Sequence, residues 1–303
     1  MTSDHSRSSI WVATVTLQTS DDRFSETNPY TEKNKDRLEG LFRIVEKVSS
    51  EISGSGVVLF PGGWVHTGKK PAESIFSILE KKISSFLKNL SAHVVVSIGI
   101  DGSFDREGFD RDQISITLDK SGIISIAKKY QVKTSEEKKR VHLTTDFRFG
   151  DFGKSRIFSL NGIRFYPAIC YDTYGPQQYK LENPGVDVIL SHVHYFVPLT
   201  EDGPKGVVDF VRKGFVGASA QWHCPVFGAA IFIRRGIPKS WRTGMIYRSH
   251  PKPYMKSKIE ENSIMPFKSF TDSNFFEGSV LVQIFDLGDL ITEKGKKLNE
   301  IKL

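Results

Sequence analysis

Short apolar runs typical of strands alternate along this chain with longer runs of helical periodicity. The run from Ile10 to Gln18 precedes a segment, Leu38 to Ile52, in which apolar residues recur at three- and four-residue spacing. A buried strand is expected from Gly56 to Gly63, and a second amphipathic helix from Ile75 to Leu90. This alternation predicts an α/β protein in which helices and sheets pack in layers.

In the middle of the chain, two strand-like runs follow each other without a helical run between them. The runs ISITLD and GIISIAKKY are separated by Lys120, Ser121 and Gly122, which predicts a hairpin. A helical stretch is expected from Val207 to Gln221, and the remaining strand-like runs are SRIFSL, GIRFYPAIC, VDVILSHVHYF, PVFGAAIFIRR and SVLVQIFDL. The longest stretch without clear periodicity runs from Pro238 to about Asn274, and such stretches tend to be functional loops or disordered.

Length and composition are compatible with one large domain, 1–303, because 39% of the residues are hydrophobic. No apolar run approaches the roughly 18 residues of a membrane span, and the N-terminus lacks the apolar stretch of a signal peptide. We therefore expect a cytoplasmic protein without a membrane partner. The two cysteines, Cys170 and Cys224, are too few for a disulfide framework or for a cysteine-based zinc site.

The net charge of +7 is not concentrated in a stripe or an arm, as it usually is in proteins that bind nucleic acid. The densest basic clusters combine Lys128 and Lys129 with 138–140, or lie between Lys252 and Lys258 in a segment that contains proline. A solvated basic surface is the simpler interpretation. Nucleic acid is therefore not expected as a partner.

The segment GIRFYPAICYDTYGPQ, Gly162 to Gln177, resembles the nucleophile motif of the nitrilase (carbon–nitrogen hydrolase) superfamily, in which an apolar strand ends in Cys, an aromatic residue and Asp. VVLFPGG, GVDVILSHVHYF, GASAQWHCPVFGA and the closing SVLVQIFDL resemble other family passages, so the similarity extends from about Ile10 to Leu287. The resemblance implies a four-layer α-β-β-α sandwich that assembles as a homodimer or larger.

The resemblance also implies a Glu-Lys-Cys triad that cleaves amides or nitriles through a thioester, with Cys170 as the nucleophile. A thiol with a pKa of about 8.5 is mostly protonated at neutral pH, so it needs a neighbouring base. The glutamate position after Phe60 and Pro61 is Gly62, followed by Gly63. Two glycines leave room for a ligand or for a base from elsewhere, and both are expected at the substrate site.

The family lysine, which stabilises the oxyanion, has two candidates. Lys133, after Tyr130, is the first choice, and Lys139 is the second. The supporting second carboxylate of the family would fall on one of Glu136, Glu137 and Asp146, and the sequence does not choose among them.

Histidines are candidates for a substitute base, because Cys-His pairing activates thiols. His66 lies four residues after Gly62, and His192 and His194 lie two residues apart on a predicted strand beside the nucleophile, where we expect one of them to face inward. His66 and His192 are the catalytic candidates, and Tyr171, Asp172 and His194 are expected to contact substrate. His192 and His194 lack an identifiable third ligand, so neither a metal nor another cofactor is expected.

The sequence thus favours a carbon–nitrogen hydrolase or acyl-transfer enzyme that acts on a small amide-like substrate through a thioester on Cys170. The alternative is a catalytically inactive protein of the same fold that binds a small molecule or a partner protein. A base within about 3.5 Å of the Cys170 sulfur would favour the enzyme, and its absence would favour the inactive protein.

Overall fold

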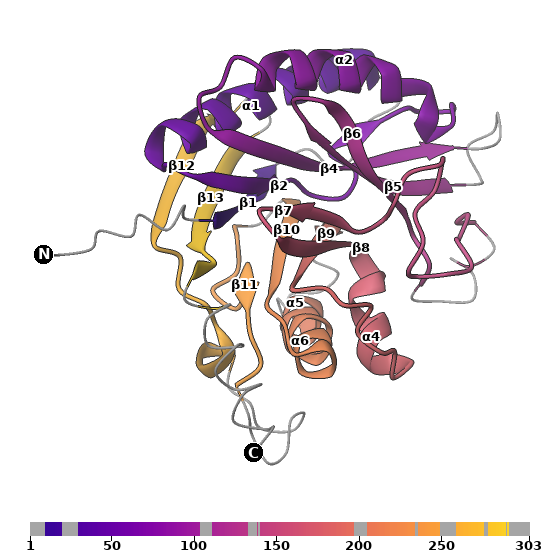
Figure 1. The fold of residues 1–303 in the computed structure, drawn as a ribbon, viewed down its shortest axis with the longest axis vertical. Helices are drawn as coiled ribbons and strands as arrows, with labels where there is room; N and C mark the ends of the chain where they lie inside the picture. Colours follow the sequence, from indigo (N-terminus) through magenta and orange to yellow (C-terminus); the bar gives the residue numbers. More distant parts are fainter. Residues whose placement is uncertain are drawn as a thin grey trace, which may run out of the picture.

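The computed structural model describes residues 10–19, 30–103, 111–132, 138, 140–196, 205–233, 236–248, 259–275, 278–288 and 290. Its strands form one hydrogen-bonded sheet whose main path runs β6-β5-β4-β2-β1-β10-β9-β8-β7. The sheet folds over on itself into two layers, which are joined where β1 pairs with β10 in parallel, from Thr16 opposite Ala230 to Thr19 opposite Ile233 (Figure 1).

The first layer contains β1 (Ile10–Thr19), β2 (Ser55–Leu59), β3 (Val65–His66), β4 (His93–Ser103), β5 (Arg111–Asp119), β6 (Gly122–Lys128), β12 (Lys268–Phe275) and β13 (Gly278–Asp286). The second contains β7 (Phe158–Leu160), β8 (Ile163–Ile169), β9 (Val188–Phe196), β10 (Val226–Ile233) and β11 (Gly244–Met245). Strands β8, β9 and β10 are parallel, as are β1, β2 and β4, so each layer gathers the carboxyl ends of its parallel strands at one edge.

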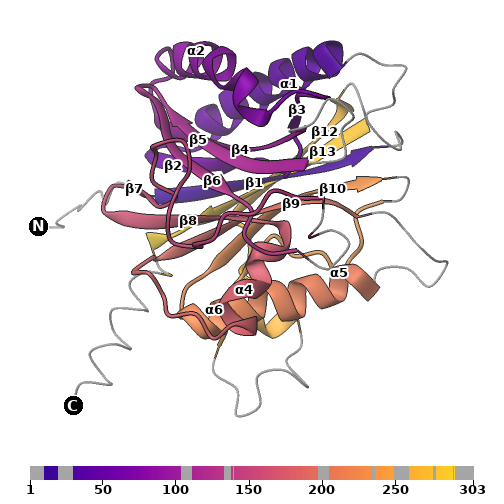
Figure 2. The same ribbon diagram turned by 90° about the vertical axis from the view of Figure 1, so that its right-hand side faces the viewer.

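Helices cover the outer face of each layer (Figure 2). The apolar stripes of α1 (Tyr30–Glu51) and α2 (Phe76–Leu87) pack on the first layer. The second layer is covered by α4 (Gly175–Gln178), α5 (Lys205–Asp209), a π-helical turn (Phe210–Phe215) and α6 (Val216–Trp222).

A third core lies between the two layers. It joins Val12, Leu59 and Val95 of the first layer to residues of the second, including Phe165 and Leu190. Burial of apolar side chains on both faces of both layers accounts for the nearly continuous apolar strands. The four-layer α-β-β-α sandwich expected from the sequence is confirmed.

Two local predictions are also confirmed, and one segment differs. The hairpin forms with Asp119 opposite Gly122, and the helical stretch expected from Val207 is formed by α5, the π-helical turn and α6. In the aperiodic segment from Pro238 to Asn274, β12 was not predicted because its polar, largely exposed residues give little apolar signal. Residues 249–258 of that segment lie outside the described residues.

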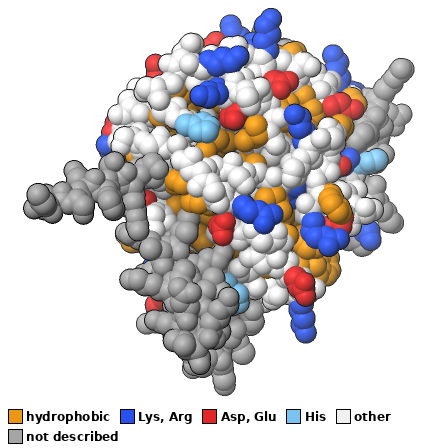
Figure 3. Space-filling model, viewed as in Figure 1, with side chains coloured by type: hydrophobic (Ala, Val, Ile, Leu, Met, Phe, Trp, Pro, Cys, Tyr) orange, Lys and Arg blue, Asp and Glu red, His pale blue; other side chains and the backbone are white. Residues whose placement is uncertain are grey.

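On the face shown in Figure 3, Lys and Arg side chains lie scattered among acidic ones, without a continuous basic stripe. Within the described ranges, no helix combines the length and the apolarity that crossing a membrane requires.

Candidate active site

Cys170 follows the last residue of β8, at the carboxyl edge of the second layer, and begins a 3-10 turn that ends at Tyr174. Its φ of 51° lies in the left-handed region, which costs a non-glycine residue about 1–3 kcal/mol unless neighbouring contacts hold it. The side chain is half-buried. A thiol held at a strained strand end is an arrangement typical of functional sites.

Gly62 follows β2 of the first layer, and its N–H donates to the carbonyl of Val193 on β9 of the second layer at 3.0 Å. A Cβ atom on Gly62 would meet the His194 ring, 2.7 Å from Nδ1 and 2.8 Å from Cε1, and would come within 2.9 Å of the His192 carbonyl oxygen. The position at which the resemblance implies a glutamate therefore has no room for a side chain, because an imidazole occupies the space.

His194 projects from β9, is 7% exposed, and donates from Nε2 to Oδ1 of Asp101 on β4 at 2.7 Å. This charged contact joins the two layers. The other ring nitrogen, Nδ1, is buried and has no hydrogen-bond partner among the described residues. His194 thus has one nitrogen held by a carboxylate and a second nitrogen available for proton transfer.

The electrostatics of His194 and Cys170 are coupled. Burial lowers the pKa of His194, but Asp101 and the Cys170 thiol outweigh it and raise that pKa to about 9. Burial raises the pKa of Cys170, but interactions with His194 and the charge of Lys129 outweigh it and lower that pKa below its usual value. Both shifts favour a thiolate paired with an imidazolium at neutral pH.

His192 lies on the same face of β9 as His194, so the expectation that one of the two faces inward is wrong: both do, because residues two apart on a strand share a face. Its Nδ1 donates to the Phe60 carbonyl at 2.8 Å, and its Nε2 lies 3.0 Å from the Ser97 hydroxyl. Burial lowers the pKa of His192 to about 3. Both of its nitrogens are thus engaged in contacts between the layers, which leaves neither for proton transfer.

His66 lies on β3, where its backbone N–H donates to Asn34 Oδ1 at 2.9 Å. A Cβ on Gly63 would lie 3.2 Å from His66 Nε2 and 3.1 Å from Asp101 Oδ2. Gly63 has a φ of 61°, and its carbonyl accepts from Arg37 at 2.8 Å. His66 therefore lies near the carboxylate that holds His194.

Among the described residues, Lys129 is a lysine whose charge acts on the Cys170 thiol, and it was not among the lysines predicted from the sequence. It follows β6, is 1% exposed, and donates from Nζ to Gln113 Oε1 at 2.6 Å. The signal was its position directly after an apolar strand. Lys133 and Lys139 lie outside the described residues, as do Glu136 and Glu137. Asp146 is paired with Arg148 at 2.7 Å.

Asp172 is fully buried, and its carboxylate accepts backbone N–H groups. Its expected contact with substrate stays a prediction. Tyr171 is half-buried and stacks on Tyr174, with ring centroids 5.1 Å apart. Both rings pack edge-on against Phe210 of the π-helical turn. The aromatic rings thus form one wall beside the nucleophile turn.

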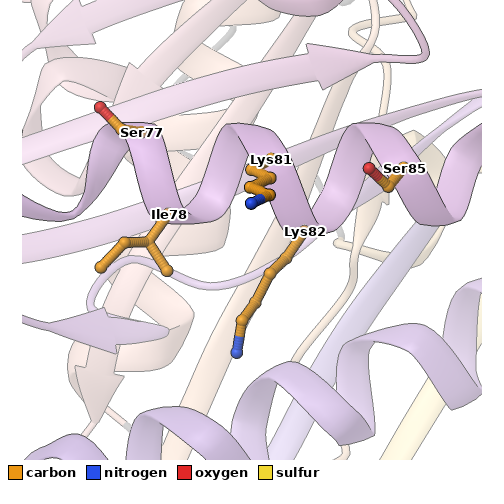
Figure 4. A pocket seen from close by; sticks show the side chains of 5 residues that line it. All are labelled: Ser77, Ile78, Lys81, Lys82 and Ser85. Atoms are coloured by element: carbon orange, nitrogen blue, oxygen red, sulfur yellow. The ribbon is translucent and has the colours of Figure 1, made fainter.

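A surface hollow of about 530 Å³ lies elsewhere, on the outer face of α2 (Figure 4). It is lined by Ser77, Ile78, Lys81, Lys82 and Ser85. Because α2 covers the outside of the first layer, whereas Cys170 follows β8 of the second, this hollow is not part of the site around Cys170.

The coupling between Cys170 and His194 predicts a pH dependence for thiol alkylation. In the wild type, Cys170 should react with iodoacetamide at neutral pH and faster than buried Cys224, because its thiolate forms below its usual pKa. In Asp101→Asn the His194 pKa should fall, and the midpoint of Cys170 alkylation should move to higher pH. Rates followed by mass spectrometry across pH test this. An unchanged midpoint, or equal rates for both thiols, would contradict the coupling.

No protein-family model matches the sequence, and no curated protein is significantly similar to it. The structure is similar to that of a double mutant of the amidase from Nesterenkonia sp. AN1 in complex with acrylamide, with a TM-score of 0.51 and 12% identity over 100% of both chains. A second structure, of a mutant Nesterenkonia AN1 amidase described as from the nitrilase superfamily, aligns over 97% of each chain with a TM-score of 0.49 and 11% identity. The first of these two similarities shows that the chain has the α/β fold of that amidase.

Proposed function

We propose that this protein is a member of the nitrilase superfamily that hydrolyses a small amide-like substrate, or transfers its acyl group, through a thioester on Cys170. The observation that carries the proposal is the arrangement of Asp101, His194 and Cys170, in which the carboxylate binds one imidazole nitrogen and the thiol interacts with the ring. The fold supports it, because amidases use the same scaffold.

In the first half of the reaction, the Cys170 thiolate attacks the substrate carbonyl carbon and a carbon–sulfur bond forms. The carbonyl electrons move onto oxygen, and the charge of buried Lys129 stabilises the oxyanion. When the oxyanion collapses, the carbon–nitrogen bond breaks and the amine leaves with a proton from the His194 imidazolium. Cys170 then carries the acyl group as a thioester.

In the second half, neutral His194 accepts a proton from water, or from another nucleophile, as that molecule attacks the thioester carbonyl. The carbon–sulfur bond then breaks, the acid or acyl product leaves, and the thiolate and imidazolium are restored. Asp101 holds the His194 ring in orientation throughout, as the carboxylate does in other catalytic triads.

His194 takes the role that the family gives to glutamate. The missing Cβ at Gly62 makes room for the imidazole, and the two side chains would exclude each other. The base is therefore His194 and not His66 or His192, the residues predicted from the sequence. The cation that stabilises the oxyanion is Lys129 and not Lys133 or Lys139.

Acylation of Cys170 tests the proposal. We expect a p-nitrophenyl ester, used as an activated acyl donor, to add one acyl group to the chain, detected by intact mass and located by peptide mapping. The adduct should be lost in Cys170→Ala and retained in Cys224→Ser. Ammonia release from a series of small primary amides then measures turnover. Absence of both adduct and turnover would overturn the proposal in favour of an inactive binding protein of this fold.

A further inference from the structure

A buried ion pair lies directly behind the nucleophile turn. The side chains of Arg156 and Asp172 are both 0% exposed, and Arg156 Nη1 lies 3.6 Å from Asp172 Oδ2. The guanidinium is held between the rings of Tyr130 and Tyr166, 5.4 and 5.3 Å from their centroids, and Nη1 donates to the Tyr166 hydroxyl at 3.0 Å. Each charged partner is therefore fixed in position by several contacts.

The hydrogen bonds of this pair reach the backbone on both sides of Lys129. Asp172 Oδ1 accepts from the N–H groups of Tyr130 at 2.9 Å and Gln131 at 2.8 Å. Arg156 Nη2 donates to the Lys128 carbonyl. The peptide groups before and after Lys129 are thus tied to one ion pair, which sets where the lysine leaves the backbone.

The same pair also reaches the backbone beside Cys170. Asp172 Oδ2 accepts from the Ile169 N–H at 3.2 Å, and Tyr130 returns a bond from its hydroxyl to the Asp172 carbonyl at 2.7 Å. These bonds close the turn in which Cys170 adopts its left-handed φ of 51°. One carboxylate therefore joins the segment of the lysine to the turn of the nucleophile.

Stability alone does not explain this choice of residues. Desolvation of two charges is costly, and apolar residues of similar volume often serve a core as well or better. Ion pairs that are retained in a core are best attested where they set a register. Here the register is that between β6, which ends before Lys129, and β8, which ends before Cys170.

Resting on the proposed function, we infer that Arg156 and Asp172 form a positioning pair that holds Lys129 at the distance from Cys170 that oxyanion stabilisation requires. Neither side chain needs to touch the substrate, and both act through the backbone of the residues that do. A displacement of about 1 Å in such an arrangement can lower a rate about 10²-fold.

The test removes both charges at once in Arg156→Met/Asp172→Asn, so that the net charge near Cys170 stays the same and no buried charge is left unpaired. We expect kcat for the activated ester to fall about 10²-fold with little change in KM, and the pH midpoint of Cys170 alkylation to rise because Lys129 is no longer held near the thiolate. Val45→Ala, which removes buried volume beneath α1, is the control for lost stability alone.

A double-mutant cycle with Lys129→Met gives a second readout. If the pair acts by positioning Lys129, its removal should cost much less in the Lys129→Met background than in the wild type. The inference would be overturned if Arg156→Met/Asp172→Asn had the same kinetics and alkylation profile as Val45→Ala at equal Tm. It would also be overturned if the losses of rate in the cycle multiplied fully. If the double variant does not fold, Arg156→Lys enters the same comparison, because it keeps the charge opposite Asp172 but loses the planar fork that reaches the Tyr166 hydroxyl and the Lys128 carbonyl.

The alkylation profile requires no turnover, so it separates this inference from the proposed function. A wild type that fails to hydrolyse or transfer acyl groups removes the proposed function, whereas an alkylation midpoint unchanged by loss of the ion pair removes the positioning role.

Discussion

Replacement of His194 by alanine is expected to lower the rate of Cys170 acylation by about 10²–10⁴-fold, the usual contribution of a general acid–base group. The imidazole that pairs with the thiolate would be lost, so the Cys170 pKa would rise and no group would protonate the leaving amine. Pre-steady-state release of ammonia from a small primary amide measures acylation directly. The effect should fall on kcat rather than on KM, since the histidine acts in the chemical step.

The other two histidines provide the comparison. His66→Ala should reduce the rate less than His194→Ala does. His66 lies near Asp101 and Gly63, so its loss would disturb only the surroundings of the carboxylate that holds His194. His192→Gln should mainly lower Tm, because the His192 ring bonds the Phe60 carbonyl and Ser97 between the layers. A full rate in His194→Ala, with loss of activity in His66→Ala or in folded His192→Gln, would show that the base is elsewhere.

An exchange of base between positions 62 and 194 tests the same idea from the opposite direction. Gly62→Glu alone should inactivate the protein, because its Cβ would lie 2.7 Å from His194 Nδ1. In Gly62→Glu/His194→Ala the contact with the imidazole is removed, although the Cβ still meets the His192 carbonyl oxygen at 2.9 Å. The carboxylate can then approach Cys170, so acylation should exceed that of Gly62→Ala/His194→Ala, which carries the same Cβ. Gly62→Ala/His194→Ala is the matched control, since it differs only in the carboxylate-bearing part of the side chain. Equal rates for the two double variants would contradict the exchange.

Replacement of Lys129 by methionine should lower kcat by about 10²–10³-fold, comparable to loss of one oxyanion-stabilising group in other enzymes. Methionine keeps much of the side-chain volume and removes the charge that helps to lower the Cys170 pKa. Loss of this buried ammonium leaves Gln113 without its partner at 2.6 Å, so we expect a modest fall in Tm. Steady-state kinetics with the activated ester and with small amides measure the effect.

The choice between the lysine inferred from the structure and those inferred from the sequence is tested by measuring kcat for Lys129→Met, Lys133→Met and Lys139→Met side by side. A loss of kcat in either of these variants, with full activity in Lys129→Met, would transfer the oxyanion role to the segment that follows Gln131. Thermal unfolding of all three variants separates a loss of catalysis from a loss of fold.

The layers of the fold follow from patterns that are local in the sequence. Apolar runs such as Ile10–Thr19 must be buried on both faces, and the helical stripe from Leu38 to Ile52 must pack on one, which leaves few arrangements besides helices outside two sheets. The edge strand Lys268–Phe275 was not predicted because its residues are polar and largely exposed, and its place in the sheet is set by pairing with β13. Local hydropathy carries no signal for such pairing.

The sequence by itself determined the scaffold, the cysteine at the end of a buried strand and the absence of a carboxylate after Phe60-Pro61. The identity of the candidate base and of the oxyanion cation emerged only from the tertiary structure. Gly62, Asp101 and His194 come from three strand ends in two layers, and the space left by one residue is filled by a side chain 132 positions later in the chain. Hydropathy and spacing report which face of an element is buried, whereas proton transfer depends on which atoms meet across the layers, and packing decides that.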